Sequence, residues 1–521
     1  MTKKTLIVLI LILILAGFFR FWKLGEIPPG LYPDEAINGN EAILDPGKVF
    51  YPENNGREGL FINILNLSFL FCGKSIWTMR AVSAFFGTLT VLGLYLLVKE
   101  LFIQTTNDKR QATSIALLAS FFLAISFWHT NFSRIVFRAI LLPFVLVFSF
   151  YFLLKGFRVK KIWNFIVAGI FFGLGFHTYI SFRFAVLILP AVLIPYWFIY
   201  KNQNLKKKFL LPTGYFLLVT ILVALPIGIH FLKNPKDLVG RAAPITIFKQ
   251  ENPFKAFLTS LFSHLGMFNL YGDPNWRHNL STSPMLLWPL GILFLIGILL
   301  LIKELISSIK NKKLLPIASY SLLIAWFLAM ILPGVLTFEG IPHSLRVIGV
   351  IPVVYIFIAL AAEKIYQFLA VNTKTKPLLV FACLFLLFAI SFSEFNKYFV
   401  KWGKNPEVEG AFTKKYVEIG NYLNSLSEET KKYVIVNELG SPLYGISIPA
   451  QTVIFIENTK FDQPRAIYLR AEDLNQIKIA QGKTVIVPLY NGRLSEALHE
   501  KFPEIELEER KYFNIYKIDK E

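Results

Sequence analysis

Two adjacent carboxylates follow the first apolar segment of the chain. Residues 5–22 carry almost no polar group, and the stretch GLYPDEAINGNEAI (30–43) then places Asp34 beside Glu35. A carboxylate that is partly desolvated and close to cations can act as a general base toward a hydroxyl group. The alternative explanation is structural, because Asp is a favoured residue at the start of a helix.

Polar residues recur where later apolar segments end. Arg134 and Arg138 are four residues apart, which predicts one shared helix face, and His343 with Arg346 is expected to open a helix. Such cation pairs suit a phosphate group. The candidate residues are Glu58 in NGREGLF (55–61), Arg134 and Arg138 in FWHTNFSRIVFR (127–138), Tyr179 and Arg183 in FHTYISFRF (176–184), and Glu339, His343 and Arg346 in LPGVLTFEGIPHSLRVIG (332–349).

The composition is that of a membrane protein. Of the 521 residues, 55% are hydrophobic, which is too apolar for a soluble protein. In a soluble chain the net charge of +20 would suggest nucleic acid, but residues 395–521 hold 18 basic and 18 acidic residues. The excess charge therefore lies among the apolar segments, and we expect no nucleic-acid partner.

Eleven segments are apolar and long enough to cross a bilayer as helices, which takes about 20 residues each. No signal-peptide cleavage site is clear after the first segment, so we expect it to remain as a helix. The predicted fold class is mainly α, a polytopic membrane bundle. The predicted helices cover residues 5–22, 76–98, 113–130, 136–154, 162–178, 184–200, 209–231, 285–302, 314–332, 347–366 and 378–394.

The distribution of lysine orients these helices through the positive-inside rule. With the N-terminus in the cytoplasm, the cytoplasmic segments are short and hold 20 basic residues, 18 of them Lys. Loops 23–75, 232–284 and 333–346 then lie outside, together with the C-terminal domain. We expect a multi-pass protein of the inner or plasma membrane, in contact with membrane lipid.

Arginine, in contrast, is concentrated on the predicted outer side. Lys is a point charge that suffices for orientation, whereas the planar guanidinium of Arg grips phosphate or carboxylate with two hydrogen bonds. Pairing with outer carboxylates or lipid headgroups is the structural alternative, and we favour an anion site. Within residues 1–394, the nine outer arginines are Arg20, Arg57, Arg80, Arg134, Arg138, Arg183, Arg241, Arg277 and Arg346.

The chain changes character after Ser393. Strands that alternate with helices predict a small α/β domain, and we place the boundary between a transmembrane domain at 1–395 and an extracytoplasmic domain at 396–521. The predicted strands are 432–439, 451–457, 483–490 and 512–518, and the predicted helices are 412–426 and 492–502.

Three histidines outside the predicted helices raise the question of a metal. His264, His278 and His343 with Asp34 offer suitable donor atoms, but their spacing matches no known ligand motif. We therefore expect no metal and no other cofactor, with a divalent metal ion as the alternative.

Taken together, these stretches resemble the bacterial and archaeal relatives of two membrane glycosyltransferases of the GT-C class. These are the dolichyl-phosphate-mannose protein mannosyltransferases and the lipid A aminoarabinose transferase. The resemblance covers about residues 1–395. It depends on six short stretches of sequence and on the order in which they occur. The pieces are PPGLYPDEA (28–36), NGREGLFINIL (55–65), SRIVFRAILLP (133–143), YISFRFAVL (179–187), RHNLSTSPMLLWPLG (277–291) and LPGVLTFEGIPHSLRVIGVIPVVY (332–355).

The resemblance implies inverting transfer of a sugar from a polyprenyl-phosphate donor to an acceptor hydroxyl outside the membrane. The acceptor is a lipid, a protein or a polysaccharide. The catalytic carboxylate of the family carries over to Asp34, and Glu35 completes its acidic pair. The residues implied to hold the lipid phosphate are Arg138, Arg183, Arg346, Arg134 and His343, and those expected to position the substrate are Glu58, Tyr179 and Glu339.

Two other classes of protein share part of this pattern. A transporter or flippase of lipid-linked glycans would also need many helices and outer arginines. Transporters usually place ionisable residues near the bilayer midplane and contain repeated halves, whereas these predicted helices are nearly free of charge and show no repeat. A membrane-anchored binding protein would need far fewer helices. The sequence therefore favours a glycosyltransferase.

Overall fold

The computed structural model describes most of the chain. The described residues are 2–106, 108–240, 242–370, 376–443, 445–461, 463–479, 481–492 and 494–520, so that Arg241 lies outside them. The chain forms two compact units. Unit 1 comprises Met1–Trp22, Val49–Phe61 and Ser83–Trp402, and unit 2 comprises Lys23–Lys48, Ile62–Val82 and Gly403–Glu521. The sequence-based domain boundary at residues 395 and 396 stays a prediction.

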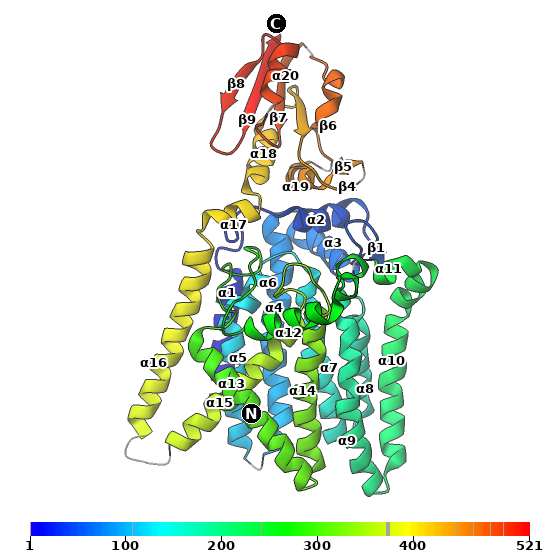
Figure 1. The fold of residues 1–521 in the computed structure, drawn as a ribbon, viewed down its shortest axis with the longest axis vertical. Coiled ribbons are helices and arrows are strands. Elements are labelled where there is room, and N and C mark those ends of the chain that lie inside the picture. Colours follow the sequence, from blue (N-terminus) through cyan, green and yellow to red (C-terminus); the bar gives the residue numbers. More distant parts are fainter. Residues whose placement is uncertain are drawn as a thin grey trace. The chain divides into compact units, whose positions relative to one another are not determined.

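Unit 1 is a bundle of long helices (Figure 1). Its α-helices are α1 (Lys3–Phe21), most of α4 (Ile76–Ile103), α5 (Lys109–Ile125), α6 (Phe127–Phe132), α7 (Leu141–Val159), α8 (Ile162–Gly175), α9 (Leu189–Asn202), α10 (Lys206–Lys233), α11 (Pro235–Val239), α12 (Pro253–Gly266), α13 (Trp288–Lys310), α14 (Leu314–Val335), α15 (Ile351–Leu369) and α16 (Lys376–Phe395). Helix α8 packs against α7 and α10, α9 packs against α14, and α15 packs against α5 and α13.

Shorter elements complete unit 1. They are β1 (Phe50–Tyr51) and β2 (Arg57–Glu58), the 3₁₀ helices η1 (Arg138–Ile140), η2 (Ile180–Ile188), η3 (Ala243–Ile245), η4 (Ile247–Lys249) and η5 (Ile348–Val350), and the π-helix η6 (Asn396–Trp402). Strands β1 and β2 pair antiparallel, with Phe50 opposite Glu58. This pairing fixes the loop that carries Glu58.

The bundle has the character of a multi-pass membrane protein. Within the described residues, nine helical segments are long and apolar enough to cross a membrane, and each coincides with a predicted span. The shorter apolar helix α8 coincides with the predicted span 162–178. The remaining predicted span, 113–130, is divided between α5 and α6 at Ser126. The mainly helical membrane fold is therefore confirmed.

Two glycines allow α8 and α10 to approach closely. Gly169 and Gly173 are four residues apart on α8. An added Cβ at Gly169 would lie 2.6 Å from the carbonyl oxygen of Phe216, and one at Gly173 would lie 2.8 Å from that of Thr220. Small residues at this spacing are common where membrane helices meet, because they let two backbones pack together.

Unit 2 contains a five-stranded sheet in the order β6-β3-β7-β9-β8. Strands β6, β3 and β7 are parallel, and β9 pairs antiparallel with β7 and with β8. The elements of this unit are α2 (Pro33–Leu44), most of α3 (Leu60–Cys72), α17 (Pro406–Ala411), α18 (Lys414–Ser425), β3 (Lys431–Val436), β4 (Pro442–Leu443), β5 (Ile446–Ser447), η7 (Ile448–Ala450), α19 (Gln451–Lys460), β6 (Ile467–Arg470), η8 (Ala471–Gln476), β7 (Gly482–Pro488), α20 (Leu494–Lys501), β8 (Glu506–Glu509) and β9 (Asn514–Lys520).

The sheet is buried on both faces because its strands alternate between two cores. Val434 and Val436 of β3 point into a core that α18 and α19 cover. Tyr433 and Ile435 of the same strand point into a second core, to which Leu498 of α20 contributes. Side chains on a strand point alternately to opposite faces, so one strand serves both cores.

The predicted small α/β domain is present, with one wrong element. The segment 451–457 forms helix α19, although a strand was predicted there. A short apolar run is compatible with either structure, and here all residues from Gln451 to Asn458 are buried, so packing decides. Strands β6 and β8 and helix α3 were not predicted, because the strands are only four residues long and α3 lies in an expected loop.

Candidate active site

Asp34 and Glu35 lie in the first turn of α2 in unit 2. Glu35 is fully buried. Its carboxylate accepts a hydrogen bond of 3.0 Å from the backbone N–H of the cap residue Tyr32 and lies 3.7 Å from Nε of Arg80. Asp34 is half-buried and is not the cap residue. The sequence suggested that Asp34 caps the helix, but it is Glu35 that accepts the hydrogen bond at the start of α2. The two neighbouring carboxylates are therefore in different environments.

The loop before α2 is held by Arg80. Its guanidinium is fully buried and donates to the carbonyl oxygens of Leu24 (3.4 Å), Pro28 (2.8 Å) and Gly30 (2.7 Å). Gly30 has a φ of +79°, and a Cβ there would lie 2.4 Å from the carbonyl oxygen of Phe412. Only glycine combines that φ with that close approach.

The C-terminal part of unit 2 also contacts this loop. The hydroxyl groups of Thr413 and Thr452 both donate to the carbonyl oxygen of Leu31, each at 2.9 Å. Further along α2, the amide of Asn40 donates to the backbone and side-chain oxygens of Gln451, both at 3.0 Å. Helix α2 and its acidic pair are thus fixed by residues 382 to 421 positions away in sequence.

In unit 1, Arg138 contacts two other residues that the sequence predicted for the site, Glu58 and Tyr179. Its Nε donates to Glu58 at 2.6 Å, and its guanidinium carbon lies 5.4 Å from the ring centre of Tyr179. Arg138 also donates to the carbonyl oxygen of Gly56 at 3.3 Å. Arg138 and Glu58 are both buried, so this is a buried ion pair rather than an exposed surface pair.

Arg134 is separated from Arg138 by a break in the helix. The predicted shared helix face is wrong, because α6 ends at Phe132 and η1 begins only at Arg138. The guanidinium of Arg134 is fully buried and donates to the carbonyl oxygens of Phe19 (3.1 Å) and Arg20 (2.9 Å). Carbonyls at a helix C-terminus lack partners within the helix, and Arg134 satisfies two of them at the end of α1.

Arg346 lies in the loop between α14 and α15. The prediction that His343 and Arg346 open a helix is wrong, since α15 begins at Ile351 after the short η5. Arg346 donates to the carboxylate and the carbonyl oxygen of Glu339, both at 2.7 Å, and to the hydroxyl of Thr337 at 3.0 Å. These bonds curl the loop around the guanidinium, which explains why it is not helical.

An apolar cavity of about 220 Å³ lies next to Arg346 in unit 1. Arg346, Tyr179, Ser181 and two threonines supply its polar groups, and the other lining side chains are apolar. The lining residues are Tyr179, Ile180, Ser181, Phe184, Ala242, Ile245, Thr246, Phe248, Pro333, Leu336, Thr337 and Arg346. Tyr179 contacts both this cavity and Arg138, so it connects the two cationic groups.

Arg183 lies on η2, in the same segment as Tyr179. It donates to the carbonyl oxygen of Leu238, and its guanidinium carbon lies 4.9 Å from the ring centre of Phe231. It is half-buried, and its charge is placed over an aromatic face. The turn predicted before it is present between α8 and η2.

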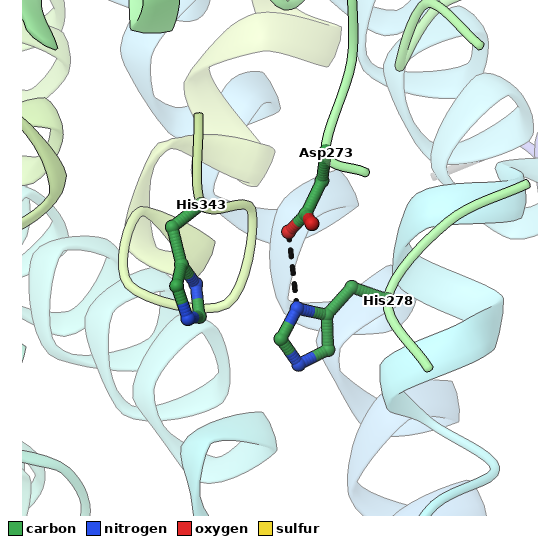
Figure 2. A group of neighbouring side chains, drawn as sticks. All are labelled: Asp273, His278 and His343. Atoms are coloured by element: carbon green, nitrogen blue, oxygen red, sulfur yellow. Dashed lines mark hydrogen bonds and ion pairs between the residues drawn. The ribbon is translucent and has the colours of Figure 1, made fainter. Parts of the chain in front are cut away.

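His343 belongs to a different cluster from the arginines. Figure 2 shows its ring beside that of His278, with the Asp273 carboxylate above the His278 ring. Nδ1 of His278 lies 3.0 Å from that carboxylate, and the backbone N–H of His343 donates to Nε2 of His264 at 3.1 Å. Three of the histidines considered as metal ligands thus lie together. The sequence analysis did not predict that Asp273, in the turn GDPN, belongs to this group. Its position five residues before His278 could have indicated it.

Burial and charge set the protonation of this cluster. Burial, followed by the charge of Arg346, lowers the pKa of His264 to about 4. Burial, followed by the charges of His278 and Arg346, also lowers the pKa of His343 well below its usual value. For Asp273 burial alone would raise the pKa, but the charge and hydrogen bond of His278 hold it below the usual range. His264 and His343 are therefore neutral near pH 7 and Asp273 is ionised.

The predicted residues thus form separate groups. Unit 2 holds Asp34 and Glu35. In unit 1, Glu58, Arg138 and Tyr179 lie together. Arg346, paired with Glu339, lies beside the cavity that Tyr179 also lines. Arg134 and His343 contact other residues. The sequence named Arg80 only within the set of outer arginines, for which an anion site was favoured, and it did not single out Thr413 or Thr452, because the partners of these residues are distant in the chain.

Comparison with known proteins agrees with this architecture. Among solved structures, the chain is similar to ArnT from Cupriavidus metallidurans bound to undecaprenyl phosphate, with 12% sequence identity, a TM-score of 0.55, and coverage of 99% of this chain and 98% of that one. It is also similar to the archaeal oligosaccharyltransferase AglB from Archaeoglobus fulgidus in complex with an inhibitory peptide and a dolichol-phosphate. There the identity is 12%, the TM-score 0.50, and the coverage 93% and 69%.

These matches define the class of the fold. The chain has the GT-C fold, with apolar helices long enough to cross a membrane and a small sheet domain at its C-terminus. Within that class, residues 60–230 match the family described as dolichyl-phosphate-mannose-protein mannosyltransferase. No curated protein matches the chain.

Proposed function

We propose that this protein is an inverting glycosyltransferase that uses a polyprenyl-phosphate-linked sugar as its donor. In the reaction, the acceptor oxygen forms a bond to the anomeric carbon of the sugar, and the bond from that carbon to the phosphate oxygen breaks. The acceptor proton passes to Asp34, and polyprenyl phosphate leaves. The GT-C fold and the mannosyltransferase match over residues 60–230 support this class of reaction.

The observation that carries the proposal is the pairing of Arg346 with an apolar cavity. A polyprenyl phosphate is a hydrocarbon chain that ends in an anion, so its site needs an apolar pocket with a cation at one edge. The cavity of about 220 Å³ beside Arg346 has both properties. The undecaprenyl phosphate and dolichol-phosphate in the two related structures support a carrier of this kind.

We assign the charge on the leaving phosphate to arginines of unit 1. Arg346 is the first candidate because it lines the cavity, and Arg138 and Arg183 follow because they lie on the same segments as Tyr179 or contact it. Planar guanidinium groups meet phosphate oxygens with paired hydrogen bonds, which stabilise the developing charge. The bonds of Arg134 suit a role in fixing α1, so we leave it out of this set.

We assign the proton transfer to Asp34 rather than to Glu35. Glu35 is fully buried and is used by Tyr32 and Arg80, whereas Asp34 is half-buried on the same turn. A base must reach both solvent and substrate, which favours Asp34. We further propose that the N-terminus is cytoplasmic, because the Lys-rich connections then lie inside, and that transfer takes place on the extracytoplasmic side of the inner or plasma membrane.

The proposal is tested by the lipid-linked sugars of host membranes. Cells that carry wild-type protein and cells that carry Asp34→Asn are compared at equal expression, with lipid extracts and surface glycans analysed by mass spectrometry. We expect a polyprenyl-phosphate sugar to accumulate in the variant and one surface glycan to lose the mass of that sugar. The mass difference then identifies the sugar class and the acceptor.

Asp45→Asn is the matched control, since Asp45 stands at the other end of α2 and pairs with exposed Lys48. We expect this variant to match wild type in both measurements. Unchanged lipid and glycan profiles in Asp34→Asn, with the protein folded and present, would contradict the proposed role of Asp34.

A further inference from the structure

Three side chains that commonly bind metals converge from two loops of unit 1. Asp273 and His278 lie between α12 and α13, and His343 lies between α14 and α15 (Figure 2). One ligand atom from each lies within 4.8 Å of the other two, and the two imidazole rings are 4.9 Å apart between their centres. Asp273 and His278 are buried, and His343 is half-buried.

The hydrogen bonds of the cluster leave donor atoms unused. Nδ1 of His278 is bonded to Asp273 at 3.0 Å, and Nδ1 of His343 has one long contact of 3.4 Å with the backbone N–H of Arg346. Nε2 of His343 has no hydrogen-bond partner among the described residues, and Nδ1 of His278 becomes available when a metal replaces its bond to Asp273. Two imidazole nitrogens beside one ionised carboxylate are a typical donor set for a transition metal.

We propose that Asp273, His278 and His343 form a binding site for a divalent transition-metal ion, with Zn²⁺ as the best match. Two nitrogens and one oxygen are the donors that zinc accepts at about 2.0–2.2 Å in a tetrahedral site. Ligand atoms on such an ion are roughly 3.3 Å apart, so the three side chains draw together on loading. The fourth position is left for water or another oxygen ligand.

The outer partners of such a site are already in place. Oδ2 of Asp273 accepts hydrogen bonds from the backbone N–H (2.7 Å) and the hydroxyl (2.8 Å) of Ser344. Its Oδ1 accepts from the backbone N–H of Asn275 at 2.8 Å. A metal replaces the bond from His278, while the bonds from Ser344 and Asn275 orient the carboxylate, as outer hydrogen bonds do in metal sites.

The ion would join two loops that are otherwise far apart in sequence. One loop contains Arg277, and the other contains Glu339 and Arg346. Binding would therefore restrain the loop that carries Arg346 without a contact to the arginine itself. The existence of the site does not depend on the proposed transfer reaction, so metal binding and sugar transfer succeed or fail separately.

The test is the zinc content and thermal stability of the purified full-length protein after its affinity tag has been removed. The protein is stripped with EDTA, loaded with Zn²⁺ and desalted, and bound zinc is counted by mass spectrometry. We expect one zinc per chain in wild type and a higher unfolding temperature in the loaded form. His278→Ala and His343→Ala should lose both effects, and Ser344→Ala should weaken zinc binding by about 10–100-fold.

His230→Ala is the matched control. Nε2 of His230 lies 2.8 Å from the carboxylate of Asp237, so it forms a similar His–Asp pair, but this pair has no third ligand among the described residues. The control should keep one zinc per chain and the full rise in unfolding temperature.

X-ray absorption at the zinc edge of the wild-type protein tests the ligands without any variant. We expect two imidazole ligands and at least one oxygen at about 2.0–2.2 Å. Wild-type protein that retains no zinc after desalting, zinc retained equally by the His278→Ala, His343→Ala double variant, or a spectrum without imidazole ligands would each overturn the proposal.

Discussion

Asp34 and Glu35 show how two neighbouring side chains of the same charge come to differ. Glu35 is buried, caps α2 and faces Arg80, whereas Asp34 keeps part of its surface accessible one position earlier on the helix. The sequence predicted the acidic pair but not this division. Arg134 is the opposite case, because its type suggested a phosphate ligand while its bonds are to α1 carbonyls more than 100 residues away.

Arg346 provides a prediction at this scale. Arg346→Lys keeps the charge but loses the planar fork, so the donor phosphate would lose a charge-assisted hydrogen bond worth about 1.5–3 kcal/mol. We expect the KM for the lipid-linked donor to rise by about tenfold or more, measured from the donor dependence of transfer in vesicles. Arg510→Lys, at an exposed arginine bonded to Glu508, should leave the KM unchanged. An unchanged KM in Arg346→Lys would contradict the phosphate role.

At the scale of elements, the start of α2 depends on the C-terminal part of unit 2. Thr413 and Thr452 both donate to the carbonyl oxygen of Leu31, three positions before Asp34. The strands β3, β7 and β9 were predictable from local sequence, because each contains a short stretch rich in β-branched or aromatic residues: YVIV, TVIV and IYKI. Helix α19, which carries Thr452 and packs on α2, was not, because its burial and not its local pattern determines its conformation.

Removal of these two hydroxyl groups should affect the position of Asp34. Thr413→Val with Thr452→Val keeps the side-chain shape but leaves the Leu31 carbonyl without these donors, at a cost of about 1 kcal/mol per bond. We expect kcat of transfer to fall several-fold while the KM for the donor stays constant. The control is Thr459→Val on α19, whose hydroxyl bonds only within its own helix, to Ile456. A rise in KM with kcat unchanged would contradict a positioning role.

The contact between α8 and α10 gives a prediction of stability. Gly173→Ala would place a Cβ 2.7 Å from Val223 and 2.8 Å from the Thr220 carbonyl oxygen, and such overpacking typically costs about 1–3 kcal/mol. We expect a lower unfolding temperature in detergent, followed by circular dichroism. Gly214→Ala on α10 has no neighbour within 4 Å and should leave the unfolding temperature unchanged or raise it. Equal stability of the two variants would contradict the proposed close packing.

At the scale of the whole molecule, the length of the apolar segments predicted the helical bundle, and the lysine distribution predicts an orientation that is still to be tested. Each apolar segment long enough to span a bilayer is helical, because the lipid interior requires backbone hydrogen bonds to be satisfied within the segment. The grouping of segments 23–48 and 62–82 with residues 403–521 in unit 2 was not foreseen. That grouping comes from long-range contacts, which local periodicity does not encode.

The predicted orientation is testable by cysteine labelling in a background that lacks Cys72 and Cys383. Glu506→Cys lies on an exposed position of β8, and Lys310→Cys lies at the exposed end of α13. We expect a membrane-impermeant maleimide to label Glu506→Cys in intact cells, and to label Lys310→Cys only after the membrane has been permeabilised. The reverse pattern would contradict the cytoplasmic position of the Lys-rich connections.

The central claim is transfer from a polyprenyl-phosphate sugar with Asp34 as the base. It is tested most directly by release of free polyprenyl phosphate from the isolated donor lipid by purified protein in vesicles with acceptor present. We expect wild type and Asp45→Asn to release it at the same rate, and Asp34→Asn to be slower by about 10²–10⁴-fold, the usual contribution of a general base. Release by Asp34→Asn at the wild-type rate, or no release by the wild-type protein, would contradict the account.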